Sequence, residues 1–395
     1  MKYIIDSPNK IIKSARNIPQ TEKWHWCYFG VDMTKRHKIE LELSSSRRYY
    51  YAKEIRKLSH EMKTPFLDGM ASINSNHKDS LKWWATRLPS KSVLQTDFFL
   101  LLCYFNLIRK WCIEGLEING TLLIAVGDPF LLKMLKMSLG NKKGVYVGSP
   151  QLDIMKYKIV ALIRMVLVRG WFIFKCAIML FNDFVLKIQY REKYYRMISY
   201  NPDVLTCTWV ENRCFKQGEF KDMYLGDLLP IYRERNFKAI LTTLTGLTYS
   251  LKKQLLKLKE DIIIISFFLK FKDCLKATFS IPINICEREK MIFCDYDYSL
   301  LFIREYLLEI GSLFHISNLL EYYAYKNYFA KQKDKKLFIY PFENQPWEKM
   351  VLLAIKDSGI SIRTAGYQHS SVPEMLLTNF LGKNEAEVMP LPDNL

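Results

Sequence analysis

The order of apolar and polar positions along the chain alternates between strand and helix signals. An apolar run at Thr121–Val126 leads through a Gly-Asp-Pro turn into a helical pattern over Phe130–Leu139, and a short apolar run follows at Val145–Val147. A strand, a turn with Pro at the first helical position, a helix and a strand together form a βαβ unit. This part of the chain is therefore predicted to build a parallel sheet.

The same succession of elements occurs twice more. The predicted strand, helix and strand are Val204–Val210, Met223–Arg235 and Lys238–Leu244 in one unit, and Leu337–Phe342, Pro346–Ser358 and Ile362–Tyr367 in the other. Strands that alternate with helices are typical of α/β folds with parallel sheets. We expect the unit at 337–367 to lie in a different lobe from the first two.

With 395 residues the chain is long enough for two domains, each with its own core. We expect an N-terminal lobe over 1–295, with a basic helical insertion near 157–190, and the start of a C-terminal lobe over 296–395. The segment Pro390–Asp393 has the composition of a lead-in to another strand. The second lobe is therefore expected to be incomplete at the C-terminus.

Weaker signals fill the remaining stretches. Apolar runs favour a buried helix over Thr96–Cys112 and helices over Leu255–Phe271 and Leu300–Phe329. Residues Met1–Asp6 have the pattern of a short strand, and a polar strand is predicted near Lys38–Leu43. The rest of residues 1–90 shows no regular pattern.

The stretch Ile159–Val185 is apolar but contains four charged residues, Arg164, Arg169, Lys175 and Asp183. A membrane-spanning helix needs about 20 almost uncharged residues, so this stretch is predicted not to span. Two interpretations remain. The helix lies in a membrane interface with Trp171, Phe172 and Phe174 toward the lipid, or it is a core helix of the domain.

Composition supports a globular protein that meets phosphate groups. Hydrophobic residues make up 49% of the chain and charged residues 25%, and the formal net charge is +18. A surplus of Lys and Arg attracts nucleotides, nucleic acids and anionic lipid headgroups. We therefore expect an anionic membrane surface among the partners. Nucleic acid is not expected, because no recognition helix or RNA-binding signature is present.

The cysteines indicate no metal site. None of the nine forms a CxxC pair or stands at ligand spacing from a His, so no zinc site is expected. No other cofactor is expected either. No secretory signal opens the chain, and free thiols are typical of a reducing compartment. The expected location is the cytoplasm, peripheral at the inner face of the cell membrane.

Several large enzyme classes are excluded by their missing motifs. No GxGxxG, GxxxxGK[ST], HExxH or GxSxG occurs at a strand-to-helix turn. Their absence argues against dinucleotide oxidoreductases, P-loop enzymes, zinc proteases and α/β-hydrolases.

The third βαβ unit contains the most informative candidate chemistry. Glu343 follows its first strand and His369 its second, and parallel strands bring both to one sheet edge. A carboxylate, an imidazole and the hydroxyls of Ser370 and Ser371 suit sugar transfer, which needs a proton acceptor and donors for a leaving phosphate. Trp347 and the free amides of the helix start at 346–348 are expected on the wall of the same site. The alternative is a well-capped helix with no further role.

A second group of polar residues lies in the loop after the strand at Val204–Val210. Asp222, Tyr224 and Asp227 follow that strand at what should be another carboxyl edge. We expect them to approach the site from the first lobe. Alternatively, Asp222 caps a helix and Gly226 is a packing position.

Four segments resemble a bacterial family of surface carbohydrate (O-antigen type) biosynthesis proteins: Phe342–Met350, Gly366–Ser370, Ser80–Thr86 and Phe220–Asp227. Along the chain these segments stand in the family's order, so the resemblance extends over most of the chain. The resemblance implies a GT-B-like pair of Rossmann lobes and transfer of a sugar from a nucleotide-sugar donor to a surface polysaccharide or lipid-linked glycan. A relation to Kdo transferases, which use a CMP-sugar, is also implied.

The candidate residues follow from these two groups and from the resemblance. The catalytic candidates are Glu343, His369, Asp222 and Asp227, and the substrate-binding candidates are Asn344, Trp347, Glu348, Gln368, Ser370, Ser371, Tyr224 and Gly226. The alternative function is a non-catalytic basic protein that binds membranes or polyanions and shares the fold.

Overall fold

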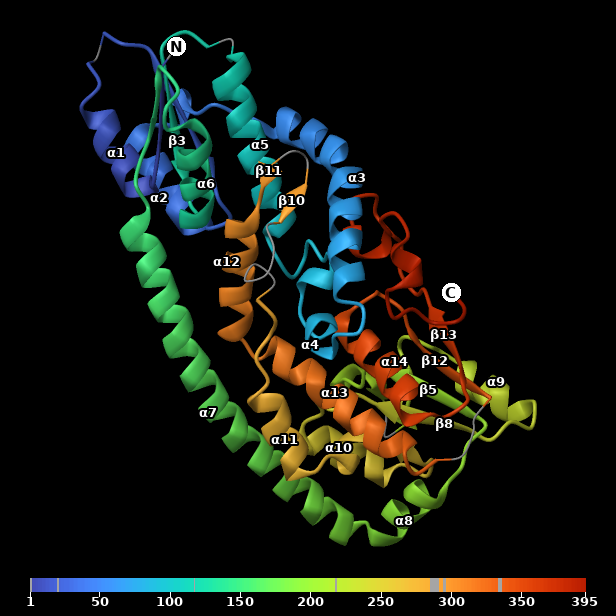
Figure 1. Ribbon diagram of the computed structural model, residues 1–395. Helices are drawn as coiled ribbons and strands as arrows, with labels where there is room; N and C mark the ends of the chain where they lie inside the picture. Colours follow the sequence, from blue (N-terminus) through green and yellow to red (C-terminus); the bar gives the residue numbers. More distant parts are fainter. Residues whose placement is uncertain are drawn as a thin grey trace. The chain divides into compact units, whose positions relative to one another are not determined.

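The computed structural model describes residues 2–19, 21–116, 118–216, 219–284, 291–293, 296–332 and 336–395 (Figure 1). The chain forms two compact units. The first consists of Met1–Ser72, Lys91–Ile163 and Asn284–Leu308, and the second of Ile73–Ser90, Arg164–Ile283 and Glu309–Leu395. The chain therefore enters each unit several times and does not divide at the predicted boundary between 295 and 296, where Asp295 itself lies outside the described residues.

The first unit is built on a four-stranded parallel sheet. Its strands have the order β2-β3-β1-β4, with bounds β1 Lys2–Asp6, β2 Trp24–Phe29, β3 Thr121–Val126 and β4 Val145–Val147. Its helices are α1 Pro8–Arg16, α2 Met33–Leu43, α5 Phe98–Glu114, α6 Pro129–Leu139 and most of α3 Ala52–Asn76 and α12 Ser299–Ile310. Each residue of β3 is buried, as expected for a central parallel strand.

The segment Lys38–Leu43 was predicted as a strand and is helical. Asp32 caps α2 by accepting hydrogen bonds from the amides of Thr34 and Lys35. Within the segment only Ile39 and Leu43 are buried, four residues apart, while Leu41 is 74% exposed. A spacing of four is the period of a helix face, and the polar residues between made it resemble a strand.

The second unit is built on a five-stranded parallel sheet of order β13-β12-β5-β8-β9. The strands are β5 Val204–Thr208, β8 Ala239–Thr243, β9 Ile262–Ile263, β12 Leu337–Pro341 and β13 Arg363–Tyr367. Its helices are α4 Leu81–Trp84, α8 Arg191–Ser199, α9 Leu228–Glu234, α10 Tyr249–Lys257, α11 Phe271–Thr278, α13 Phe314–Phe329 and α14 Pro346–Ser358. The molecule is thus an α/β protein with two parallel sheets.

All three predicted βαβ units are present, but their distribution between lobes differs from the prediction. β12 pairs with β5, so the unit at 337–367 shares a sheet with the unit at 204–244, and only the unit at 121–147 belongs elsewhere. Every residue of β5 is buried. Burial on both faces is typical of strands in a parallel sheet, and the local sequence does not show which distant strand pairs with such a strand.

Two long helix predictions were also wrong in part. The run predicted as a helix over Leu255–Phe271 holds the end of α10, then β9 and a 3-10 turn at Ile265–Phe268. Four consecutive isoleucines favour the extended chain, and periodicity alone does not separate a buried strand from a buried helix. The run Leu300–Phe329 is interrupted between α12 and α13.

Short elements complete the description. Two-stranded antiparallel pairs are formed by β6 Phe215–Lys216 with β7 Glu219–Phe220 and by β10 Ile292–Phe293 with β11 Tyr296–Asp297. Further 3-10 turns lie at Ser45–Arg47, Leu88–Ser90, Asn212–Cys214, Leu377–Asn379 and Glu385–Glu387.

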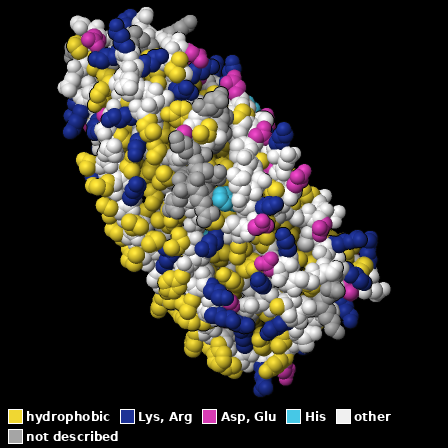
Figure 2. All heavy atoms as spheres, viewed as in Figure 1, with side chains coloured by type: hydrophobic (Ala, Val, Ile, Leu, Met, Phe, Trp, Pro, Cys, Tyr) yellow, Lys and Arg dark blue, Asp and Glu magenta, His cyan; other side chains and the backbone are white. Residues whose placement is uncertain are grey.

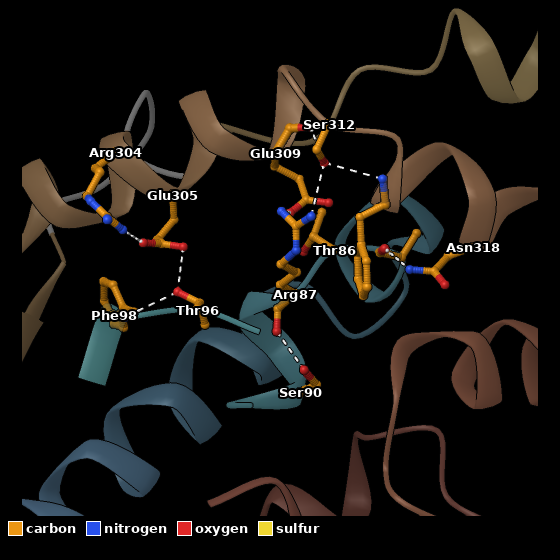
Figure 3. A network of polar contacts seen from close by, with 12 residues as sticks. Thr86, Arg87, Ser90, Thr96, Phe98, Arg304, Glu305, Glu309, Ser312 and Asn318 are labelled. Carbon is orange, nitrogen blue, oxygen red and sulfur yellow. Dashed lines mark hydrogen bonds and ion pairs between the residues drawn. The ribbon is translucent and has the colours of Figure 1, made fainter. Parts of the chain in front are cut away.

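Buried polar networks tie distant segments into each unit (Figure 3). In the second unit Arg87 donates to Glu309 at 3.1 Å and to Ser312, and Asn318 donates to the carbonyl of Ala85. These bonds fix the segment 73–90, which contains the buried Trp83 and Trp84, to the end of α12 and the start of α13.

A separate network lies in the first unit, where Arg304 bonds Glu305 and Thr96 donates to the same carboxylate (Figure 3). Arg304 also donates to Asp128 at 2.6 Å, at the start of α6. Each charge of this buried group has a partner, which such a group requires.

The longest helix is α7, Gln151–Gln189, whose residues from Arg164 onward belong to the second unit. Within the described residues no helix combines the length and the apolar character that crossing a bilayer requires.

Candidate functional site

The carboxyl ends of β5 and β12 form the reversal point of the second sheet. From β5 the chain passes through α9 to β8 on one side, and from β12 it passes through α14 to β13 on the other. Because such crossovers are right-handed, the helices after two such adjacent strands cover opposite faces of the sheet. The crevice left at their carboxyl ends is where open α/β sheets bind ligands.

Glu343 and His369 meet at this edge, as the parallel strands predict. Glu343 follows β12 and His369 follows β13, and Nε2 of His369 lies 3.4 Å from Oε1 of Glu343. The Glu343 side chain is 38% exposed and that of His369 18%. Nδ1 of His369 is buried and has no partner among the described residues. Glu343 is therefore the member of the pair that meets solvent or a ligand.

Three aromatic rings pack together around His369. The rings of Tyr224 and Trp209 lie 5.5 and 6.2 Å from the imidazole, and Trp209 contacts Trp347 at 5.4 Å and Tyr224 at 4.9 Å. Trp209 directly follows β5, and Trp347 stands in the first turn of α14. Partly exposed rings beside a carboxylate suit flat or sugar-like ligands.

Glu348 holds the loop that carries Glu343. Its carboxylate accepts hydrogen bonds from the amides of Glu343, Asn344 and Gln345, each at 3.0 Å. Gln345 is the N-cap of α14, and Glu348 closes a capping box with it. Burial raises the pKa of Glu348, and the ammonium of Lys349 and the amides oppose that rise.

Asn344 belongs to the same supporting structure. Its φ of +55° is left-handed, a conformation that Asn tolerates better than most residues. Its side chain donates to the carbonyl of Thr378 and accepts from Lys349. Asn344 and Glu348 are each 2% exposed. Both were predicted to bind substrate, but their burial makes them supports of the loop.

The predicted phosphate site at the start of α14 has fewer free amides than expected. Pro346 has no N–H, the amide of Glu348 donates to the carbonyl of Gln345, and the preceding amides bond the Glu348 carboxylate. A carboxylate at the helix start occupies the position that an anion would take. Of the three predicted positions 346–348, Pro346 and Glu348 therefore offer no free amide.

Asp222 and Tyr224 lie in the second unit with Glu343, and they do not approach from another lobe. Oδ1 of Asp222 accepts from the Thr208 hydroxyl and from the amides of Tyr224 and Leu225. Asp222 thus organises the turn that places Tyr224. The Tyr224 hydroxyl donates to Glu211 and accepts from Arg213 at 2.8 Å.

The remaining predicted site residues lie in the loops after β5 and β13. Gly226 has a φ of +57°, so the turn requires it, and the exposed Asp227 precedes α9 without a side-chain cap bond. Gln368 bonds the carbonyl of Ser370, and both Ser370 and Ser371 are exposed.

The sequence interpretation missed Trp209, Glu211 and Arg213. They follow β5 directly, and a Trp with charged residues after a buried strand was a usable signal. The only cation bonded to the aromatic group among the described residues is Arg213, since its guanidinium contacts Tyr224 and pairs with Glu211 at 2.8 Å.

A further cavity of about 260 Å³ lies in the second unit beside the start of α10. Thr245, Lys252 and Glu321 line it together with apolar residues of α7. One Glu321 oxygen accepts from the amide and hydroxyl of Thr245, and the other is buried without a partner among the described residues. Burial raises the pKa of Glu321 to about 7.

The first unit has its own cavity, of about 340 Å³, at the carboxyl ends of β1 and β3. Ser7 and Asn9 follow β1, Gly127 follows β3, and Lys35 and Lys38 project from α2. Connections from β1 and β3 also run in opposite directions, toward β2 and β4. This cavity therefore occupies the reversal point of the first sheet.

No group of three His, Cys, Asp or Glu side chains suited to a metal ion occurs within the described ranges. Comparison of the chain with protein-family models, with curated proteins and with solved structures finds no match.

Proposed function

We propose that the chain is a glycosyltransferase of the GT-B type, which moves a sugar from a nucleotide-sugar donor to a surface polysaccharide or a lipid-linked glycan. The observation that carries the proposal is the Glu343–His369 pair, walled by Trp209, Tyr224 and Trp347 at the reversal point of the second sheet. All four segments that resemble surface carbohydrate proteins lie in this unit.

In the proposed reaction an acceptor hydroxyl attacks the anomeric carbon of the donor. Glu343 takes the hydroxyl proton, because it is the more exposed member of the pair. The bond between the anomeric carbon and the nucleotide phosphate breaks, and the phosphate leaves with the electron pair. His369 orients the Glu343 carboxylate, and Arg213 stands near the aromatic group as a cation for the phosphate.

GT-B transferases bind one substrate on each lobe. The first unit has a cavity that suits the second substrate of such an enzyme. Its cavity is lined by Lys35, Lys38, Asn9 and Ser7, which offer the ammonium, amide and hydroxyl groups that bind a sugar chain. We assign the acceptor to this cavity and the donor to the edge that contains Glu343.

A screen of nucleotide sugars by thermal unfolding tests the proposal. A donor at 100 times its dissociation constant should stabilise the chain by about 2.7 kcal/mol. The Glu343→Gln variant should retain this stabilisation but lose transfer. Stabilisation by a polyanion such as heparin, with none by any nucleotide sugar, would replace the proposal by the polyanion-binding alternative.

A further inference from the structure

Helix α7 has one face built into the second unit. Phe172, Cys176 and Leu186 are buried, and Asp183 pairs with Lys252 at 2.5 Å in the interior. Arg169 and Lys187 donate to the carbonyls of Thr278 and Phe267. The helix is therefore fixed to the unit along one side. On this side it is a core helix, which is one of the two interpretations that its sequence allowed.

The opposite face of α7 is apolar and exposed. Its exposed residues between 164 and 189 are Val166, Leu167, Trp171, Phe174, Ile178, Phe181, Phe184 and Ile188. Trp171 is 58% exposed, Phe174 56% and Phe181 66%. Figure 2 shows hydrophobic side chains gathered along α7, with Lys and Arg side chains beside them. Soluble monomers rarely expose so continuous an apolar surface without a binding role.

The width of this face argues against a second copy of the chain as its occupant. At 3.6 residues per turn the exposed apolar positions span about 140° of the helix circumference. A coiled-coil seam uses only two positions in seven, so it is much narrower. An apolar arc of this width, with a buried face opposite, fits the acyl boundary of a bilayer.

The charges beside the face favour the same occupant. Arg164 and Lys175 are exposed at one border of the apolar arc, and in this part of α7 the single acidic residue, Asp183, is buried. Two copies joined through the face would bring like charges together, whereas anionic headgroups neutralise them. Long Lys and Arg side chains at such a border reach the headgroups while their stems stay in apolar contact.

The neighbouring segment extends the surface. Arg169 donates to the carbonyls of Thr278 and Ser280, which places Phe279 and Ile281 beside α7. Phe279 and Ile281 are 66% and 48% exposed. The face thus comprises α7 from Arg164 onward and the segment after α11.

We propose that this face docks the chain onto a bilayer that contains anionic lipid, with α7 lying in the plane of the interface. The proposal rests on the exposed face and its charges, and it stands independently of the glycosyltransferase assignment. It deepens the membrane expectation by naming the side of α7 that enters the lipid: Trp171 and Phe174 do, whereas Phe172, once expected there, packs into the protein.

Vesicle flotation with the full chain tests the proposal. The chain should bind phosphatidylcholine vesicles that contain phosphatidylglycerol, and added salt should weaken binding. The double variant Trp171→Gln with Phe181→Gln should lower binding by about tenfold or more, because each ring loses apolar burial in the interface. Arg164→Gln with Lys175→Gln should lower binding to the anionic vesicles only.

The control is Leu41→Gln, which removes an equally exposed apolar side chain from α2 and should leave flotation unchanged. Brominated lipid should quench more tryptophan fluorescence in the wild-type chain than in the Trp171→Phe variant. This readout does not depend on the folding of the double variant. A chain that floats neither with these anionic vesicles nor with vesicles of phosphatidylcholine alone overturns the proposal. So does a dimer that the Trp171 and Phe181 changes convert into a monomer without any vesicle binding.

Discussion

The two sheets of this protein share a design but present different chemistry at the same place. Each is fully parallel, and in each the direction of the chain reverses between two adjacent strands, β1 and β3 in the first unit and β5 and β12 in the second. At the first reversal point lie Lys35 and Lys38 with hydroxyl and amide groups and the carboxylate of Asp153. At the second lie a carboxylate, an imidazole and three aromatic rings.

The difference shows that topology provides a site and side chains decide its use. Both edges offer a crevice for the same geometric reason. Lys35 and Lys38 at the first edge attract and orient a polar ligand, and the described residues that line this cavity include Asp153 but no histidine to form an acid–base pair with it. The pair Glu343–His369 at the second edge offers one, and it is held by a buried support in Glu348. Four predictions test the two units and the supports of their sites.

The largest effect is expected from Glu348→Ala. The change leaves the amides of Glu343, Asn344 and Gln345 without their acceptor in a buried loop, so the free energy of unfolding should fall by about 3 kcal/mol or more. Denaturant unfolding measures the loss. The exposed Glu387→Ala should change stability by less than about 0.5 kcal/mol. Equal stability of the two variants would show that Glu348 does not hold the loop.

Next in size is the effect of Glu343→Gln and of His369→Ala on transfer. Loss of an acid–base group should lower kcat by roughly a hundredfold, with the melting temperature nearly unchanged because both side chains are partly exposed. His369→Gln should keep more activity than His369→Ala if His369 only orients the carboxylate.

The matched change in the first unit is Lys38→Ala. It should raise KM for the acceptor by less than about tenfold and leave kcat unchanged, as for a group that binds the ground state and transition state equally. A collapse of kcat in Lys38→Ala, with normal turnover in Glu343→Gln, would move the chemistry to the first unit.

The last prediction concerns pH. The pKa of Glu321 is raised by burial from 4.5 to about 7, so the folded chain binds more protons than the unfolded chain between these values. Stability from this group is present below pH 4.5 and is lost as pH rises toward 7 and beyond. Glu321→Gln keeps an acceptor for Thr245 and removes the titration. Relative to wild type it should gain on the order of 2 kcal/mol between pH 5 and pH 8.

Paired denaturation curves of wild type and Glu321→Gln across this range measure the gain. The buried His315, whose pKa is lowered to about 3 by burial, affects both chains equally and cancels in the difference. Parallel stability profiles of the two chains would show that Glu321 stays ionised throughout.

The sequence by itself determined the local elements and one consequence of their order. Turn residues and apolar runs predicted three βαβ units, and all three are present. Because a right-handed unit makes its two strands parallel, the meeting of Glu343 and His369 at one edge followed from the chain order alone. The start of α14 was also predictable, since Gln345, Pro346 and Glu348 are local capping signals.

Only the tertiary structure decided which distant segments share a sheet and which face of each element is buried. β12 pairs with β5 across more than a hundred residues, a contact that no local pattern encodes. Asn344 and Glu348 carry side chains typical of a binding site, yet burial assigns them to the loop's support. On α7 apolar residues occur on every side of the helix, so only packing distinguishes the buried Phe172 from the exposed Trp171. Local signals act over a few residues, whereas burial depends on everything that folds against them.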